Sequence, residues 1–193
     1  KEAVTGNFWQ FYVNPVFGLP NIFYLREYLD YFYNFYKKYD CRFPIVSIAM
    51  VVYTRHLDIQ TLPLRYRHKL VEYLKTCQKH PIFNEYAEEI KSVSTFIETS
   101  LNELETYAEN LLLWQTFLKY SADYDKRTGL SMAVENANFY NILEGKDQQQ
   151  YWTLVEKSQL DTPLTSTIML RLYSVVMNYH LCIVVMMLIT TGG

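Results

Sequence analysis

The stretch PIVSIAMVVYTRHLDIQTLPLRYRHKLVEYLK, residues 44–75, decides the predicted fold. It opens with Ile45 to Val52, a run of eight residues in which only Ser47 is polar. A continuous run of Ile and Val is typical of a strand that is covered on both faces, as in parallel sheets. The stretch therefore predicts a buried strand, followed by a polar crossing and a helix.

Start and stop signals predict the helix of this stretch. Leu62-Pro63 places a proline where the first helical turn tolerates one, and Thr61 is the expected cap. The helix is expected to run to about Gln78, because His80-Pro81 ends it.

Upstream, the pattern changes from strand to helix. Residues 8–13, FWQFYV, predict a short strand, and Asn14-Pro15 is expected to end it. From Ile22 to Tyr36 apolar residues recur every three or four positions, which predicts a helix with Asn21 as its cap. The order strand, helix, strand favours a parallel unit with a right-handed crossover.

Downstream, the chain is predicted to be helical. Residues 83–120 contain no Gly or Pro and keep helical spacing, which predicts one long helix or two with a minor break. Its apolar face packs on its own domain or on a coiled-coil partner. Residues 121–129 are predicted to be a charged turn, residues 144–150 a polar break, and residues 151–160 a short helix.

The last apolar segment, residues 172–190, holds 19 residues without Asp, Glu, Lys or Arg. That is close to the length of about 20 residues that spans a bilayer. Asn178 and His180 lie in its middle, where lipid burial is costly, which favours burial within a protein. A tail anchor in a membrane and a non-native tail are the alternatives.

Composition bounds the class of protein. The chain has 193 residues, a net charge of −2 and a pI near 6.1, so no basic balance points to nucleic acid.

Lys1 in place of Met suggests a fragment whose start lies upstream. Cys41, Cys77 and Cys182 are far apart and form no CxxC pair, which favours a reduced, cytoplasmic setting without a disulfide framework. Aromatic residues make up 17% of the chain and are expected to fill its core.

The sequence holds no self-sufficient catalytic or metal-binding motif. It contains no GxGxxG, P-loop or GxSxG pattern. The four histidines form no HxxxH or HExxH pair, so we expect no metal site within this chain. No catalytic residue is assigned.

A small basic cluster stands at the start of the helix after Pro63, formed by Arg65, Arg67, His68 and Lys69. Cations at a helix N-terminus oppose the helix dipole, which a purely stabilising design would avoid. The cluster therefore either contacts an anion or a partner, or is a surface patch that neighbouring groups neutralise.

The order of these pieces resembles the C-terminal part of the twitch-type radical SAM proteins over about residues 6–143. The likeness is carried by PNIFYLREYLDYF, the apolar strand, RHLDIQTLPLRYRHKLVEYL and FLKYSADYDKRTGLSM. The matching positions are Asn21, His56 to Ile59, Leu62-Pro63, and the pair Asp125 and Arg127. The resemblance implies Asn21 as a candidate contact to the cofactor.

The resemblance also implies what this chain lacks. In that family three cysteines spaced CxxxCxxC hold a [4Fe-4S] cluster, which passes an electron to S-adenosylmethionine and produces a radical. This motif is not in the sequence. Cluster and S-adenosylmethionine would be held by a missing N-terminal half, which is the expected partner of this chain.

We therefore predict an α/β fragment that is mostly helical. Two parallel strands, at about 8–13 and 45–52, are joined by a crossover helix and followed by a long-helix tail. Residues 1–80 are expected to end a partial barrel, residues 81–143 to be a helical extension, and residues 144–193 to be an unassigned tail.

Two functions remain open from the sequence. The first is a C-terminal fragment of a radical SAM-like enzyme, inactive alone. The second is a non-catalytic helical interaction protein, possibly with a tail anchor.

Overall fold

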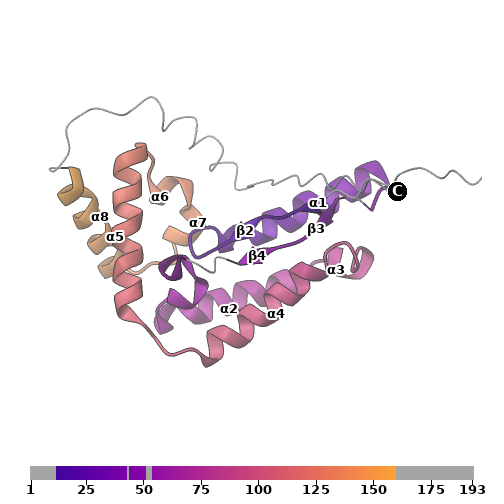
Figure 1. Cartoon of the computed structure of the whole chain (residues 1–193), viewed down its shortest axis with the longest axis horizontal. Helices are drawn as coiled ribbons and strands as arrows, with labels where there is room; N and C mark the ends of the chain where they lie inside the picture. Colours follow the sequence, from indigo (N-terminus) through magenta and orange to yellow (C-terminus); the bar gives the residue numbers. More distant parts are fainter. Residues whose placement is uncertain (1–11, 43, 51–53, 160–193) are drawn as a thin grey trace, which may run out of the picture.

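The computed structural model describes residues 12–42, 44–50 and 54–159, and these are mostly helical (Figure 1). The strands and 3₁₀ helices are β1 (Tyr12–Val13), β2 (Val16–Phe17), β3 (Ile45–Val46), β4 (Ala49–Met50), η1 (Ile22–Tyr24), η2 (Arg55–Leu57) and η3 (Ile59–Thr61). The α-helices are α1 (Leu25–Tyr39), α2 (Leu64–Gln78), α3 (Ile82–Glu85), α4 (Lys91–Thr106), α5 (Leu111–Thr128), α6 (Met132–Glu135), α7 (Ala137–Tyr140) and α8 (Gly145–Gln159).

The predicted fold class is confirmed, including its parallel strands and the helix that joins them. β1 pairs with β3 and β2 pairs with β4, both in parallel. The partners Tyr12 and Ile45 are 33 residues apart, as are Val16 and Ala49, so one register runs through both pairs. α1 connects β2 to β3.

The strands are shorter and more interrupted than predicted. Asn14-Pro15 was expected to end the first strand, but pairing resumes at β2. Pairing resumes because residues 47 and 48, which lie opposite Asn14-Pro15, interrupt the second strand as well. The register is therefore the same before and after the interruption. Residues 8–11 and 51–52 of the predicted strands lie outside the described residues.

The two edges of this small sheet differ. On the β3 side, the N–H of Val46 donates to the carbonyl of Glu89 at 2.8 Å, and the N–H of Ile48 donates to Ser92 Oγ at 3.0 Å. The start of α4 therefore covers that edge. On the β1 side, Val13 faces β3, because its carbonyl accepts from the N–H of Ser47 at 2.8 Å. Backbone groups alternate along a strand, so Tyr12 and Asn14 face outward, where the described residues supply no further strand.

Aromatic side chains form much of the core, as the composition predicts. Phe17 of β2 packs against Tyr28 of α1, with ring centroids 5.6 Å apart, and against Phe96 of α4 at 6.1 Å. Phe23 of η1 contacts Tyr73 of α2 at 5.2 Å. These contacts join β2 to α1 and α4, and η1 to α2.

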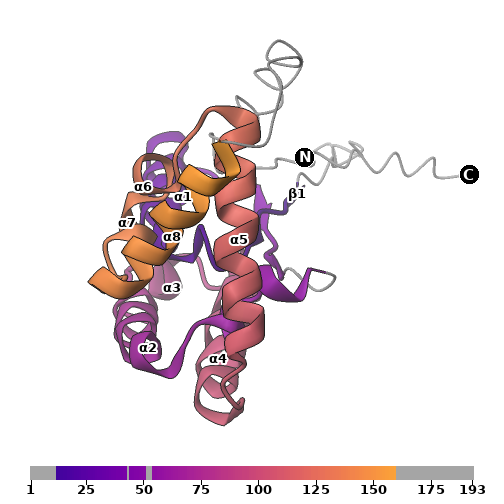
Figure 2. The ribbon, with the colours of Figure 1, turned by 90° about the vertical axis from the view of Figure 1, so that its left-hand side faces the viewer.

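The second part of the core lies where α5 and α8 run side by side, as both ribbon views show (Figures 1 and 2). Phe117 of α5 and Phe139 of α7 are fully buried, with ring centroids 5.4 Å apart. Trp114 stacks on Phe117 at 5.4 Å. Helix α5 also contacts η2 and η3, so it joins the two parts of the core.

Three helix boundaries differ from the predictions. Residues 83–120 form most of α3, all of α4 and the first part of α5, with breaks at 86–90 and 107–110. At the second break, Asn110 Oδ1 accepts from the N–H of Leu113 at 3.1 Å. The predicted charged turn, 121–129, is mostly the end of α5, because Ser121, Ala122 and Asp125 face the core. The predicted polar break, 144–150, is mostly the start of α8.

The α2 start also differs from the prediction. Pro63 is the N-cap and does not lie within the first turn. Thr61 is not the cap, because its hydroxyl donates to the carbonyl of Arg55 at 2.7 Å.

Candidate functional site

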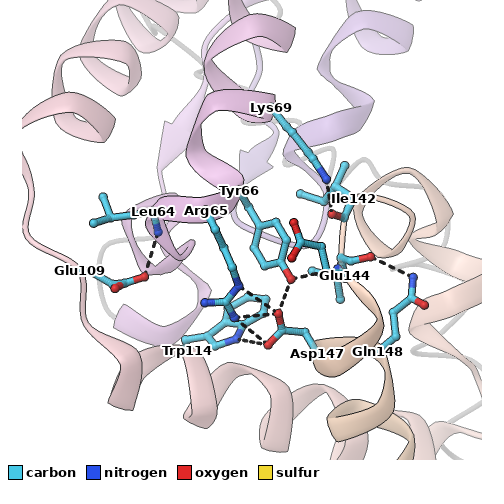
Figure 3. A network of polar contacts seen from close by, with 11 residues as sticks. Leu64, Arg65, Tyr66, Lys69, Glu109, Trp114, Ile142, Glu144, Asp147 and Gln148 are labelled. Atoms are coloured by element: carbon cyan, nitrogen blue, oxygen red, sulfur yellow. Dashed lines mark hydrogen bonds and ion pairs between the residues drawn. The ribbon is translucent and has the colours of Figure 1, made fainter.

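The most concentrated buried polar cluster surrounds the carboxylate of Asp147, which is 6% exposed (Figure 3). Both oxygens accept from Arg65, with Nη2 at 2.9 Å from Oδ1 and 2.7 Å from Oδ2. Trp114 Nε1 donates to Oδ1 at 3.2 Å, and the hydroxyl of Tyr66 donates to Oδ2. Helices α2, α5 and α8 meet at this carboxylate.

These donors keep Asp147 ionised. Burial alone acts to raise the pKa of its carboxyl, but the hydrogen bonds from Tyr66, Arg65 and Trp114 together outweigh burial and hold the pKa below its usual range. Both carboxylate oxygens of Asp147 thus already accept hydrogen bonds from side chains of the same chain. The arrangement is that of a structural clamp between helices, with the carboxylate already occupied.

Three of the four members of the predicted basic cluster have hydrogen-bond partners within the chain. Arg65 is bound by Asp147. Lys69 Nζ donates to the carbonyl of Ile142 at 2.9 Å (Figure 3). Arg67 donates only to backbone carbonyls. The cations that oppose the dipole of α2 therefore have intramolecular partners, and His68 is exposed beside them.

Arg67 is a buried cation, with only 4% of the residue exposed. Its guanidinium donates to the carbonyls of Leu62 at 2.9 Å and Gln60 at 3.0 Å, just before α2. It also donates to the carbonyls of Leu104 at 3.3 Å and Tyr107 at 2.5 Å, at the end of α4. Burial lowers the pKa of Arg67, and the carbonyls at the negative end of the α4 dipole stabilise its charge.

A second buried carboxylate, Asp125, lies further along α5 than Trp114 of this clamp and also contacts α8. Its Oδ2 accepts from the N–H of Met132 at 2.7 Å and from the hydroxyl of Tyr151. Tyr151 stands four residues after Asp147, on the same face of α8. One face of α8 therefore supplies Asp147 to α2 and Tyr151 to α5.

Replacing Asp125 by asparagine is expected to change how the free energy of unfolding varies with pH. Burial raises the pKa of Asp125, against the hydrogen bonds from Tyr151 and Met132. A raised pKa means that its contribution is fully present below the unfolded value of about 3.9 and is lost as pH rises through the folded value. Urea unfolding between about pH 4 and 7 should show that the free energy of unfolding of Asp125→Asn increases relative to that of the wild type as pH rises. A constant difference would contradict the assignment.

The predicted pair of Asp125 and Arg127 is not brought together. The carboxylate of Asp125 points into the core, whereas Arg127 is exposed and its Nε donates to the carbonyl of Asp123 at 3.2 Å. Both residues lie on α5, where positions two apart face different directions.

Asn21 closes its own loop. Its Oδ1 accepts from the N–H of Gly18 at 2.8 Å, and its Nδ2 donates to the carbonyl of Val16 at 3.1 Å. Asn21 stands at the predicted N-cap position, before η1, but its side chain makes no capping bond to that helix. The structure does bring this loop to the predicted 56–59 segment, since the N–H of Leu19 donates to the carbonyl of Leu57 at 2.7 Å.

The His56 to Ile59 segment forms η2 and the start of η3. The ring of His56 packs on Tyr120 of α5 with centroids 4.8 Å apart, and Ile59 is buried. Leu62, the next matched position, is fully buried. These residues therefore join the loop after β2 to α5.

A separate open groove of about 560 Å³ lies between β3 and α4. One wall is formed by residues 45–48 and the other by α4 side chains that include Ser92, Thr95 and Phe96. None of the matched positions, Asn21, 56–59, 62–63, 125 or 127, lines it. Phe96 is buried in the core and Ser92 is bound to Ile48, so the groove brings together no set of reactive groups.

Within residues 12–42, 44–50 and 54–159, no group of three His, Cys, Asp or Glu side chains is placed to hold a metal ion. Over the same residues, no helix combines the length and the apolar character needed to cross a membrane. The apolar segment 172–190 lies outside the residues that the structure describes.

No protein-family model, curated protein or solved structure matches the chain. The fold itself defines the class: a mostly α-helical protein that carries a small parallel strand-helix-strand unit.

The residues predicted from the sequence do not include Asp147, Trp114 or Tyr151, which organise the buried polar groups. Their partners come from helices that are distant in the sequence, 82 residues apart for Arg65 and Asp147. One signal was present: the unexplained cations at the start of α2 required an anion, and Asp147 provides it.

Proposed function

We propose that this chain is the C-terminal part of a radical SAM-like enzyme and contributes the last two strands of a partial barrel. The proposal rests on the resemblance over residues 6–143 and is supported by one structural observation, the asymmetry of the small sheet. The β3 edge is covered by α4, while the β1 edge presents the outward backbone groups of Tyr12 and Asn14. A sheet that ends on one side and is open on the other matches the end of a barrel.

In this proposal the chain has a supporting role in catalysis. The [4Fe-4S] cluster and S-adenosylmethionine would be bound by the half that carries CxxxCxxC, and the cluster supplies the electron for radical formation. The residues of this chain would extend the sheet from β1. They would also hold the strand ends in place through the Asn21 loop and the 56–59 segment, which contact each other at Leu19 and Leu57.

Sequencing upstream of Lys1 tests this proposal directly. We expect a CxxxCxxC motif within about 200 residues, the length of one domain. The longer protein, purified without oxygen, should contain about four irons per chain and cleave S-adenosylmethionine under reduction. Replacing one motif cysteine by alanine is the matched control and should abolish both. A reading frame without the motif over that length overturns the proposal.

The second candidate is a non-catalytic helical interaction protein. The observation that favours it is a group of large exposed apolar side chains where α4 leads into α5. If this second candidate is correct, the chain binds a partner without catalysing a reaction, and no cysteine motif is found upstream.

A further inference from the structure

Four exposed apolar side chains come from the start of α2 and from the corner where α4 leads into α5, which lies at the lower left of Figure 1. They are Leu64, 56% exposed, Tyr107, 51%, Leu111, 49%, and Leu112, 72%. We call these four residues the corner patch. Large apolar side chains that gather on a surface mark sites of interaction more often than single ones do.

Hydrogen bonds join the two parts of the chain that carry the corner patch. The N–H of Leu64 donates to Glu109 Oε1 at 3.0 Å (Figure 3), and Arg67 donates to the carbonyl of Tyr107 at 2.5 Å. The start of α2 therefore lies against residues 107–109, which lead directly into Leu111 and Leu112.

The side of the corner patch formed by α4 and α5 is acidic. Residues 92–118 contain four glutamates, Glu98, Glu103, Glu105 and Glu109, and no Lys, Arg or Asp, so their net charge is −4. Glu98, Glu105 and Glu109 are exposed. On the α2 side of the corner patch, Arg65 is bound by Asp147, and the buried Arg67 interacts electrostatically with Glu109.

We propose that the corner patch docks an amphipathic helix of another protein, with apolar side chains on one face and Lys or Arg at its margins. Leucine-type side chains would cover the corner patch, and the basic residues would meet Glu105 and Glu109. This inference is independent of the radical SAM-like proposal.

Charge also argues against two other occupants. A second copy of the chain would bring one stretch of charge −4 against another, and like charges across an interface are unfavourable. The chain's own segment 172–190 has the apolar side chains but no Lys or Arg, so it lacks the complementary charge.

The test uses the full chain and a fluorescent amphipathic peptide of Leu and Lys, with an otherwise identical Leu and Glu peptide as its control. Fluorescence anisotropy should show binding of the Lys peptide that weakens with added salt, and about tenfold weaker binding of the Glu peptide or none. Equal binding of both peptides would overturn the proposal.

Matched variants locate the site. Leu112→Ser should raise the Kd for the Lys peptide about tenfold, whereas Val134→Ser, at an equal exposure of 72%, should leave it unchanged. Glu105→Lys should weaken binding and its salt dependence, while Glu156→Lys on α8 should have a smaller effect on both. Equal effects within either pair would place the peptide elsewhere.

Two further outcomes would replace the proposed occupant. A free chain that sediments as a dimer, and as a monomer after Leu112→Ser, would assign the corner patch to a second copy. Cross-links between the corner patch and residues 172–190 in the free chain would assign it to the chain's own segment. Circular dichroism of each variant confirms that the helices are intact.

Discussion

Replacing Asp147 by alanine is expected to lower the free energy of unfolding by about 3 kcal/mol. The change removes the acceptor of Arg65, Tyr66 and Trp114 in a buried position where water reaches poorly. Arg65 is 41% exposed and regains part of its hydration, so the low end of the range for broken buried pairs applies. Urea unfolding near neutral pH, followed by circular dichroism, measures the change.

Glu144→Ala is the matched control for this variant. It removes a carboxylate three residues earlier, but the Glu144 residue is exposed and only its backbone joins the network, through its N–H to the hydroxyl of Tyr66 at 2.9 Å. A surface change of this kind should stay within about 0.5 kcal/mol. If both variants lose the same stability, the network does not clamp the three helices.

The contribution of Asp147 also has a defined dependence on pH. Because its folded pKa is below the unfolded value of about 3.9, its contribution is present above that value and is lost as pH falls through the folded pKa. The difference between the wild type and Asp147→Ala should therefore shrink in acid. Asp125 behaves oppositely, so the two buried carboxylates are separable by pH.

The parallel strand pair could be predicted because its signal is local and strong. The Ile and Val run follows a helix of clear periodicity. Together they predicted a strand at 45–50 and its parallel pairing with the strand before the helix. The interruption within each strand was not predictable, since it depends on two breaks that match across 33 residues.

Helix boundaries were predicted less well where packing overrides composition. The polar residues 121–128 read as a turn, yet they end a helix whose small and acidic side chains face the core. The break between α4 and α5 has no Gly or Pro to announce it and depends on the Asn110 cap. Contacts between distant helices decide such positions, and periodicity in one segment does not report them.

Contacts within the chain explain why the basic cluster stands at an unfavourable helix end. Each cation bonds to an oxygen atom of a later segment: Arg65 to α8, Arg67 to the end of α4, and Lys69 to the link before α8. The start of α2 therefore organises the C-terminal helices. Cations at the N-terminus of α2 interact unfavourably with the helix dipole, and this cost is offset by contacts that orient three other segments.

Replacing Arg67 by methionine is expected to lower the free energy of unfolding by about 4 kcal/mol. Methionine keeps most of the buried volume but leaves four carbonyls, those of Gln60, Leu62, Leu104 and Tyr107, without this donor. Each hydrogen bond from a charged group contributes about 1.5–3 kcal/mol, and partial access to water at the helix end reduces the sum. Urea unfolding measures this change as well.

Lysine at position 67 distinguishes charge from geometry. Its ammonium keeps the positive charge but is a compact group that cannot reach both pairs of carbonyls as the planar guanidinium does. Arg67→Lys should therefore lose about half as much as Arg67→Met, while Arg127→Met, at an exposed site, should stay within about 0.5 kcal/mol. Full stability in Arg67→Lys would show that charge alone suffices, and that the fork of Arg67 does not fix α2 to the end of α4.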